Sequence, residues 1–542
     1  MQYKSSVFIL LVFGILLSSV MTSSGVVSKG QTIRVVQAAD NTVSISADLK
    51  EIAESSLHSI NGQDDDLLNC GTGINYEYNK PILPYISRFI VIPPQAVVRL
   101  NVEAEDVRAV PLDSYPPLCL DSELRPVDFV NADYDIYPQS FAEISSPFII
   151  RGVRMVKLSV NPVRYQKSTN SYLFCDNLRA TLEFSDGDPV NPVENPNRQH
   201  RSREFLKFLD DFAENSDIIS RDHPDDPIHF GDHYLVVTHE GCLEYAAPFI
   251  EWRRKTGHDV DILSIPNNIS RDSDRIKALI QERYDSYLNE GLDPFDQLLL
   301  IGDRSNYAWG VVGPWQLEAD RGERIWDGAN HADYKYALLE GRDNYPDVGF
   351  SRFCAGNQPL MELFVKRTIA YEAEPYVDET DWFTRGGVYS QHWGNDEHRA
   401  WRISIHSNVR WARELLRIKG FEDVRFYEDY EYDQSGAVIG PWVRDLMNEK
   451  TNLLLGRAET LYWQQIFTGV DVNEVFPVRL VLSGHGEYAA WTSLRSGDGD
   501  NLRGPVVSTC NWAGPPTITT TATWLELVNS VVQRGMSYGW GR

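Results

Sequence analysis

The segment LSGHGEYAAW, residues 482–491, places a single histidine, His485, between two glycines directly after the apolar run RLVL. A cysteine, Cys510, ends a later apolar run, GPVVSTC. A histidine within reach of a thiol lowers the pKa of the thiol and can protonate a departing amine, which is what acyl transfer through a cysteine requires. The two residues therefore predict Cys–His chemistry, provided that their strands are neighbours.

The glycines beside His485 suit the same chemistry. Gly484 permits a sharp exit from the strand because it carries no side chain. Gly486 leaves its N–H group open to a substrate carbonyl oxygen, and together with the N–H of Cys510 it would form an oxyanion hole. The alternative is that His485 is only a turn residue and that Cys510 is a small buried apolar residue, as is common at strand ends.

The elements that must position these residues lie in the C-terminal part of the chain. From His233 onward, apolar runs such as YLVV and FDQLLLIG alternate with long helical patterns such as SDRIKALIQERYDSYLNEG. This alternation predicts an α/β domain with a doubly wound, mostly parallel sheet and helices on both faces. Catalytic groups in such sheets collect beyond the carboxyl ends of the strands. The spacing between His485 and Cys510 is long enough for one crossover between adjacent parallel strands.

The earlier part of the chain has a different pattern. Residues 30–190 contain short alternating or β-branched runs separated by Pro, Asp, Asn and Gly turns, which predicts an all-β domain. Residues 186–205 are rich in Pro, Asn and Arg and show no apolar period, so we expect an exposed linker. Exposed linkers are where proteases cut, and Arg201 and Arg203 are the candidate positions.

The first 25 residues have the layout of a cleaved secretory signal: Lys4, an apolar stretch from Val7 to Val20, then small polar residues. The apolar stretch is shorter than the roughly 20 residues that a membrane span needs, which argues against the alternative of an anchor. We therefore expect a secreted or cell-surface protein without a membrane span once the signal is removed.

Charge and cysteine content exclude several classes of partner and metal site. The chain has 51 Lys and Arg against 77 Asp and Glu, a net charge of −26, which repels nucleic acid. The cysteines form no CxxC pair, so a structural zinc site is not indicated and no metal ligand is assigned. They are Cys70, Cys119, Cys175, Cys242, Cys354 and Cys510.

The stretches SGHGEYAAW and VVSTCNWAG, followed by TWLELVNSVVQRG, resemble the gingipain-type cysteine peptidases of the caspase-like clan. In that family a His-Gly ends one strand and the nucleophilic Cys ends the next. Residues 331–353, HADYKYALLEGRDNYPDVGFSRF, are similar to a further block of the family, and the early segments VIPPQAVVRL and IIRGVRMVKLSVNPVRYQ look like its β-rich propeptide.

The resemblance implies a secreted cysteine endopeptidase made as a zymogen, with protein or peptide substrates and its own propeptide as an intramolecular inhibitor. The domains would be a signal peptide (1–25), a β-rich propeptide (26–190), a linker with the processing site (191–230) and a caspase-like α/β peptidase domain (231–542). Relatives commonly continue into further domains, so the last of these would be truncated here. Cys510 would be the nucleophile, His485 the general acid and base, Gly486 and Cys510 the oxyanion donors, and Asp347 an acid that orients the histidine.

Two features depart from the family pattern. The family's Gly-Arg is Ser351-Arg352 here, and Gln358 stands near the place where relatives that cleave after basic residues hold an acid. A preference for Arg or Lys is therefore not carried over, and Trp491, Trp512 and Gln358 are the expected substrate-binding residues. No cofactor is required. Calcium would be a structural ion at the acid-rich residues 64–66 or 497–501, although neither segment has EF-hand spacing and a solvated turn is favoured for both.

Two alternatives of another class remain open at this point. One is a catalytically inactive exported scaffold on the same α/β fold. The other is a cell-surface adhesin whose β-rich half binds a partner.

Overall fold

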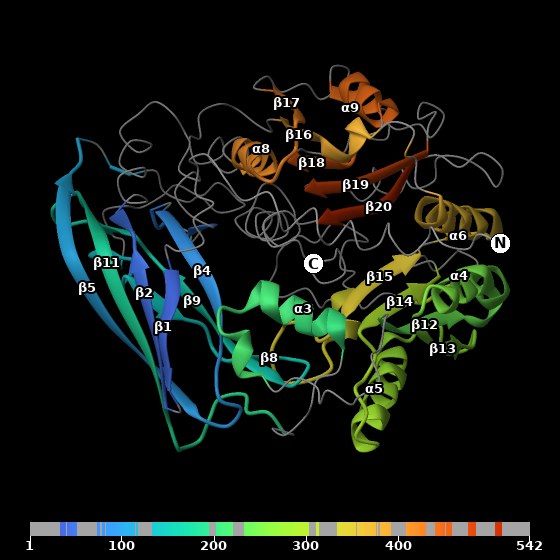
Figure 1. Cartoon of the computed structure of the whole chain (residues 1–542), viewed down its shortest axis with the longest axis horizontal. Coiled ribbons are helices and arrows are strands. Elements are labelled where there is room, and N and C mark those ends of the chain that lie inside the picture. Colours follow the sequence, from blue (N-terminus) through green and yellow to red (C-terminus); the bar gives the residue numbers. More distant parts are fainter. Residues whose placement is uncertain are drawn as a thin grey trace, which may run out of the picture.

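The computed structural model describes most of the chain between residues 33 and 511, and Figure 1 shows its arrangement. The described residues are 33–39, 41–50, 73–75, 79–81, 83–113, 115–116, 133–194, 202–219, 232–302, 310–313, 333–353, 355–374, 377, 380–391, 408–429, 439–449, 451–457, 475–483 and 504–511. The segment expected to be a signal peptide lies outside them. In the part that is described, no helix combines the length and apolar character that crossing a membrane would demand.

The N-terminal half forms two antiparallel sheets, as the alternating pattern predicts. One has the order β1-β2-β11-β10-β6, with β5 paired to β11, and the other the order β3-β4-β9-β7, with β8 paired to β9. The strands are β1 (Ile33–Ala39), β2 (Thr42–Asp48), β3 (Gly73–Asn75), β4 (Leu83–Val91), β5 (Val97–Pro111), β6 (Ile136–Tyr137), β7 (Ala142–Ile144), β8 (Phe148–Ile150), β9 (Val153–Val160), β10 (Val163–Gln166) and β11 (Ser171–Ser185).

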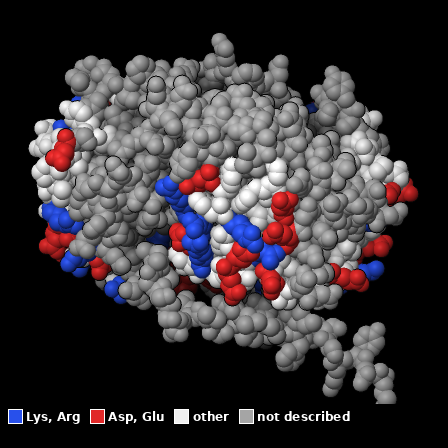
Figure 2. All heavy atoms as spheres, turned by 90° about the horizontal axis from the view of Figure 1, so that it is seen from above, with Lys and Arg blue, Asp and Glu red and all other residues white. Residues whose placement is uncertain are grey.

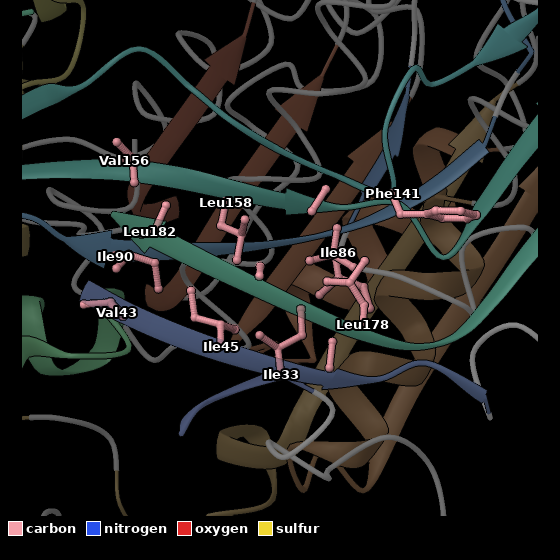
Figure 3. Packing of buried hydrophobic residues seen from close by; sticks show 14 of the residues in the cluster. Ile33, Val43, Ile45, Ile86, Ile90, Phe141, Val156, Leu158, Leu178 and Leu182 are labelled. Carbon is pink, nitrogen blue, oxygen red and sulfur yellow. The ribbon is translucent and has the colours of Figure 1, made fainter. Parts of the chain in front are cut away.

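The core of this half lies between the two sheets. Along β11, the buried residues Leu178, Ala180 and Leu182 recur at every second position, because successive side chains of a strand point to opposite faces. They pack against residues of β4 and β9 such as Ile90 and Leu158, and Figure 3 shows the side chains of the two layers directed toward one another. The pairing buries one face of each sheet.

The expectation of an irregular linker is wrong for part of residues 191–230. Arg203–Phe212 forms helix α3, which begins at the cap residue Ser202 and is followed by the short 3-10 helix η2 (Ser216–Ile218). Phe205, Phe208 and Leu209 are buried in a cluster with residues of β4, β8 and β9. The spacing of these apolar residues is helical, but the Pro, Asn and Arg around them hide it in the sequence.

The C-terminal half contains a four-stranded parallel sheet of order β13-β12-β14-β15. Its strands are β12 (His233–His239), β13 (Asp259–Ile265), β14 (Gln297–Ile301) and β15 (Gly349–Phe353). The helices and 3-10 turns in this part are η3 (Glu240–Cys242), α4 (Leu243–Lys255), α5 (Ser273–Asn289), η4 (Asp333–Ala337) and α6 (Gln358–Ala373).

Helices cover both faces of this sheet. Leu235 and Val237 of β12 pack against α5 on one face, whereas Val236 packs against α4 and α6 on the other. Such alternation within one strand requires consecutive apolar residues rather than a polar–apolar pattern, which is why the buried strands of this half read as continuous apolar runs.

A second parallel sheet of five strands follows, with the order β17-β16-β18-β19-β20. Its elements are η5 (Asp381–Thr384), β16 (Arg385–Gln391), α8 (Asn408–Ile418), β17 (Asp423–Asp429), α9 (Ile439–Asn448), β18 (Leu453–Arg457), β19 (Val475–Ser483) and β20 (Gly504–Asn511). Consecutive residues of β16, Gly386 and Gly387, approach Leu416 of α8 and Leu446 of α9, so these helices lie on opposite faces. The predicted fold class is confirmed, with the parallel strands divided between two sheets.

Candidate active site

The two strands that carry the predicted dyad are direct neighbours. β19 and β20 pair in parallel, and Leu482 is the register partner of Cys510 while Ser483 is the partner of Asn511. Paired residues of adjacent strands lie about 5 Å apart. His485 follows Leu482 by three residues, a length of chain that spans at most roughly 11 Å. The expectation of adjacent parallel strands that end near His485 and Cys510 is therefore confirmed.

Much of the predicted site lies outside the described residues. His485, Gly486, Trp491 and Trp512 are not described, and Cys510 is described only as part of the backbone of β20. The roles predicted for their side chains stay predictions. What the structure provides is the backbone arrangement, which brings the ends of the two strands to one edge of the five-stranded sheet.

Asp347 is described, and its contacts are different from those expected. It precedes β15 in the four-stranded sheet and is completely buried. Its Oδ2 accepts hydrogen bonds from the N–H groups of Leu339 at 2.6 Å and Glu340 at 2.8 Å, and its Oδ1 accepts one from the N–H of Arg151 at 2.9 Å. These described partners are all backbone amides, and one belongs to the N-terminal half. The predicted contact with His485 stays a prediction.

Burial governs the protonation of Asp347. Loss of water raises the pKa of its carboxyl well above the ordinary range, and the neighbouring Glu340 raises it further, while the three amide hydrogen bonds act in the opposite direction. Through these three hydrogen bonds, the side chain of Asp347 fixes the loop before β15 and holds the turn between β8 and β9 against that loop.

Gln358 begins helix α6, just beyond the carboxyl end of β15. Its side chain is exposed, and its Nε2 donates a hydrogen bond to Glu362 Oε1 at 2.9 Å, one turn further along the helix. The two polar side chains are thus joined at the surface of the helix. The role of Gln358 in binding substrate stays a prediction.

Arg352, at the departure from the family's Gly-Arg, has a structural role that the sequence did not show. Its Nε and Nη2 each lie 2.7 Å from the carboxylate oxygens of Asp333, and its Nη1 donates to the carbonyl oxygens of Gly302 and Val312. A planar guanidinium can make these bonds at once, which a lysine cannot. Arg352 therefore joins β14, the segment around Val312 and η4 near the carboxyl ends of the strands.

Two further thiols are described, and neither resembles a reactive cysteine. Cys175 and Cys242 are both completely buried. Burial raises the pKa of Cys175 to about 11, which leaves almost no thiolate at neutral pH. Cys242 is packed below Gly310, where a single added side-chain carbon would lie 2.2 Å from its Sγ. Close packing of this kind denies a substrate access to the sulfur.

Asp232, directly before β12 of the four-stranded sheet, has a carboxyl group with an unusually high pKa. Its Oδ2 accepts a hydrogen bond from Gln297 Nε2 at 3.0 Å, but its buried Oδ1 has no hydrogen-bond partner among the described residues. Burial, with smaller contributions from Asp296 and Glu204, raises the pKa of Asp232 to about 7. The folded protein therefore binds a proton here more tightly than the unfolded chain does.

We expect Asp232→Asn to stabilise the protein at pH 8 but not near pH 4. The stability that protonated Asp232 confers is present below its unfolded pKa near 4 and is lost as the pH rises to about 7. A shift of this size corresponds to roughly 4 kcal/mol at most. Asparagine keeps the acceptor for Gln297 and removes the charge. Thermal unfolding at both pH values measures the difference between variant and parent, and a difference that does not grow with pH contradicts the assignment.

The described surface offers no concentrated charge of one sign on the face shown in Figure 2, where basic and acidic side chains lie next to one another. In the C-terminal half, ion pairs such as Arg410 with Glu428 and Arg425 with Asp423 also bring opposite charges together. Among the described residues, no group of three or more His, Cys, Asp or Glu side chains is arranged to hold a metal ion. Residues 64–66 and 497–501, the predicted calcium segments, lie outside the described part.

The sequence matches two models of known protein families. Residues 230–522 match peptidase family C25, and residues 63–211 match the C25 propeptide. The first match contains the four-stranded and five-stranded parallel sheets, and the second contains most of the antiparallel strands together with nearly all of α3. The two matches leave residues 212–229 between them.

Individual relatives are similar at low identity. Lys-gingipain W83 of Porphyromonas gingivalis is 19% identical over 542 residues, which cover 86% of this chain and 29% of that protein. Gingipain R2 of the same organism is 22% identical over 320 residues, which cover 55% of this chain and 39% of that protein. The chain therefore spans well under half the length of either relative.

Solved structures of the same group are also similar. The complex of the pro- and mature domains of RgpB from Porphyromonas gingivalis matches with a TM-score of 0.42 and 15% identity, covering 55% of this chain and 68% of that one. The Arg-specific cysteine proteinase gingipain R matches with a TM-score of 0.41 and 16% identity, covering 58% of this chain and 70% of that one.

Proposed function

The chain belongs to peptidase family C25, and from this membership we propose that it is the zymogen of a secreted cysteine endopeptidase that acts through Cys510 and His485. The observation that carries the proposal is the parallel pairing of β19 with β20, in which Cys510 lies opposite Leu482, three residues before His485. Cys510 lies one residue before the end of β20, and in the sequence His485 follows the end of β19 by two residues.

The chemistry follows from these two side chains and two backbone amides. The thiolate of Cys510 attacks the carbonyl carbon of a peptide bond, and the N–H groups of Gly486 and Cys510 stabilise the negative oxygen that forms. Protonated His485 gives its proton to the departing amine, which leaves a thioester on Cys510. Water, deprotonated by His485, then attacks the thioester, so that the acid product leaves and the thiol is restored. Asp347 has no step in this scheme, because its described partners are three backbone amides.

The N-terminal domain is the inhibitor in this proposal. The C25 propeptide match over residues 63–211 supports this role. In the view of Figure 1, the arrows of β19 and β20 point toward the side of the molecule where β1, β2, β5 and β11 lie. The carboxyl ends of these two strands therefore point to the side on which the proposed inhibitor domain lies.

Processing is proposed to occur after α3 rather than within it. A protease needs a locally unfolded segment, and α3 is fixed by the buried Phe205, Phe208 and Leu209. Arg203 begins this helix and is therefore a poor position for cleavage, whereas Arg201 and residues 220–231 lie outside the described part. The segment between the two family matches, residues 212–229, is the proposed region. Sequencing the N-terminus of the processed protein locates the cut.

The proposal also covers substrate binding, export and calcium. Trp491, Trp512 and Gln358 would line the substrate cleft, and the residue preferred at the cleavage site is left open, because Gln358 is neutral. Export depends on residues 1–25. Calcium would be structural, and its removal by a chelator would lower stability without acting on the dyad.

A thiol-directed peptidyl probe tests the function directly. We expect the processed protein, separated from its propeptide, to incorporate one equivalent of a peptidyl chloromethyl ketone, with mass spectrometry of the digest placing the label on Cys510. Cys242 serves as an internal control, because it is a buried thiol of the peptidase domain. A processed protein whose Cys510 stays unlabelled, although the same probe labels papain, would favour the inactive exported scaffold.

A further inference from the structure

The turn between β8 and β9 places an arginine in a backbone conformation that arginine disfavours. Ile150 pairs with Val153, so Arg151 and Gly152 form a two-residue hairpin turn. Their φ angles are +48° and +78°, the combination that type I′ turns require. Asn or Gly is preferred at the first of these positions, and other residues adopt it at a cost. The contacts of the Arg151 side chain must therefore explain why an arginine occupies this position.

That side chain is completely buried, and it lies in the other domain. Nη1 donates to the carbonyl oxygen of Phe295 at 2.6 Å, and Nη2 donates to that of Pro294 at 3.0 Å. Nη2 also lies 3.1 Å from Asp293 Oδ1 and 3.4 Å from Asp296 Oδ1. Two carbonyls and two carboxylates thus surround one guanidinium. We call the segment 293–296 the arginine pocket.

The ring of Phe205 completes the enclosure from α3, with its centroid 5.1 Å from the guanidinium carbon of Arg151. Burial of a charge without partners is very unfavourable, and this pocket supplies partners of the opposite sign together with hydrogen-bond acceptors. The pocket lies between α5 and β14, at the amino end of the strand. It therefore belongs to a different sheet from that of Cys510 and His485.

Contacts around the pocket join the same two domains. Asp343 Oδ2 accepts hydrogen bonds from the N–H of Ile149 and from Asn191 Nδ2, both at 2.8 Å. The rings of Phe148 and Tyr345 stack with centroids 3.8 Å apart. Phe148, Ile149, Arg151 and Asn191 fall within the propeptide match, whereas residues 293–296, Asp343 and Tyr345 fall within the peptidase match. Cleavage between the matches would turn this contact into one between two chains.

We propose that the arginine pocket is an exosite of the peptidase domain that binds the guanidinium of Arg151 and retains the propeptide after the linker has been cut. The occupant is the β8–β9 hairpin of the chain's own propeptide, held at a place remote in the fold from the dyad. Cleavage alone then leaves the inhibitor in position, and release of the hairpin is the step that frees the enzyme. The effect on release of the enzyme rests on the proposed function, but binding of Arg151 in the pocket does not require catalysis.

The test uses the full chain with Cys510→Ala, so that binding is measured without turnover. A recognition sequence for an unrelated site-specific protease is inserted between residues 220 and 231, and the purified protein is cut there. We expect the two pieces to elute together from a sizing column at micromolar concentration. Arg151→Ala should weaken their association about a hundredfold or more, because truncating one partner of a buried charged pair leaves the other unpaired. Arg151→Lys should be intermediate, since an ammonium cannot make the forked contacts.

Arg154 provides the matched control. It is also buried, it lies on the same hairpin, and its described hydrogen bonds go to carbonyls of Pro93, Ala96, Val190 and Asn191, all within the propeptide. Arg154→Ala should destabilise the propeptide while leaving the pieces associated at temperatures where it is folded. If Arg151→Ala fails to fold, Asp293→Asn decides from the peptidase side and should also weaken association.

Three results overturn the exosite. They are separation of the cut parent at micromolar concentration, parental affinity in Arg151→Ala or in Asp293→Asn, and equal weakening by Arg154→Ala in folded protein. None of them bears on whether Cys510 is a nucleophile. Conversely, an unlabelled Cys510 in the probe experiment leaves the binding result intact.

Discussion

Cys510→Ala in the full chain is expected to abolish peptide hydrolysis and self-processing while the protein folds as the parent does. The sulfur forms the covalent intermediate in the proposed scheme, and an alanine methyl group cannot replace it. Removing the nucleophile of a catalytic set costs about 10⁴-fold or more in kcat. Parent and variant are cut between residues 220 and 231 at an inserted site for an unrelated protease and freed of the propeptide, and their hydrolysis of a fluorogenic peptide library measures the loss. Unfolding curves of the uncut chain show that the fold is kept.

Cys242→Ala is the matched control for this result. It removes a buried thiol of the peptidase domain itself, so processed enzyme carrying it should keep its activity. Self-processing supplies a second readout, because an inactive zymogen should accumulate at its full length. Hydrolysis that persists at the parental rate in Cys510→Ala, in protein free of other peptidases, would refute the assignment of the nucleophile.

The adjacency of β19 and β20, on which this experiment depends, could be predicted from the sequence, because it follows from the local pattern of apolar residues. Apolar runs alternating with helical patterns indicate parallel strands, and parallel strands bring their carboxyl ends to one edge. The positions of His485 and Cys510 at the ends of two such runs therefore predicted neighbouring strands, which the register of β19 and β20 confirms. The division of the strands between two sheets was not predicted, because the residues of one apolar strand do not indicate which other strand it will pair with.

The arginine pocket and helix α3 could not be predicted, for two different reasons. The partners of Arg151 are residues 293–296, more than 140 positions away in the chain, and two of them are carbonyl oxygens that carry no sequence signal. Helix α3 did have a signal, because Phe205, Phe208 and Phe212 lie on one helical face. The neighbouring Pro, Asn and Arg residues led to the interpretation of the whole segment as a linker.

Asp347 illustrates how a residue type can suggest a role that its contacts do not require. An acid in the block around residues 331–353 was assigned to orient His485, by resemblance. In the structure, its carboxyl group accepts hydrogen bonds from three backbone N–H groups, two from the connection before β15 and one from the hairpin turn at Arg151. The contact with His485 stays a prediction. A buried acceptor of this kind acts on stability through the amides it satisfies.

We therefore expect Asp347→Ala to destabilise the full chain by about 3 kcal/mol or more. Two buried N–H groups and one part-buried N–H group lose their acceptor, and each buried group left without one costs roughly 1–3 kcal/mol. Asp347→Asn should cost less. Its remaining carbonyl oxygen can still serve Leu339 and Glu340, while its amide group faces the N–H of Arg151, which it cannot accept. Urea unfolding in the Cys510→Ala background measures both changes without self-digestion.

Kinetics of the processed Asp347→Asn enzyme separates anchoring from orienting. An anchoring residue affects the zymogen, so kcat of the processed variant should remain within about threefold of the parent and its pH profile should be unchanged. An acid that holds the imidazole in position instead acts on the reaction itself, and losing such a partner can lower kcat by up to about 10⁴-fold. A large fall in kcat, with KM unchanged and a shifted pH profile, would show that Asp347 orients the catalytic histidine. Loss of stability with kcat retained would show that Asp347 acts only at the contact between the two domains.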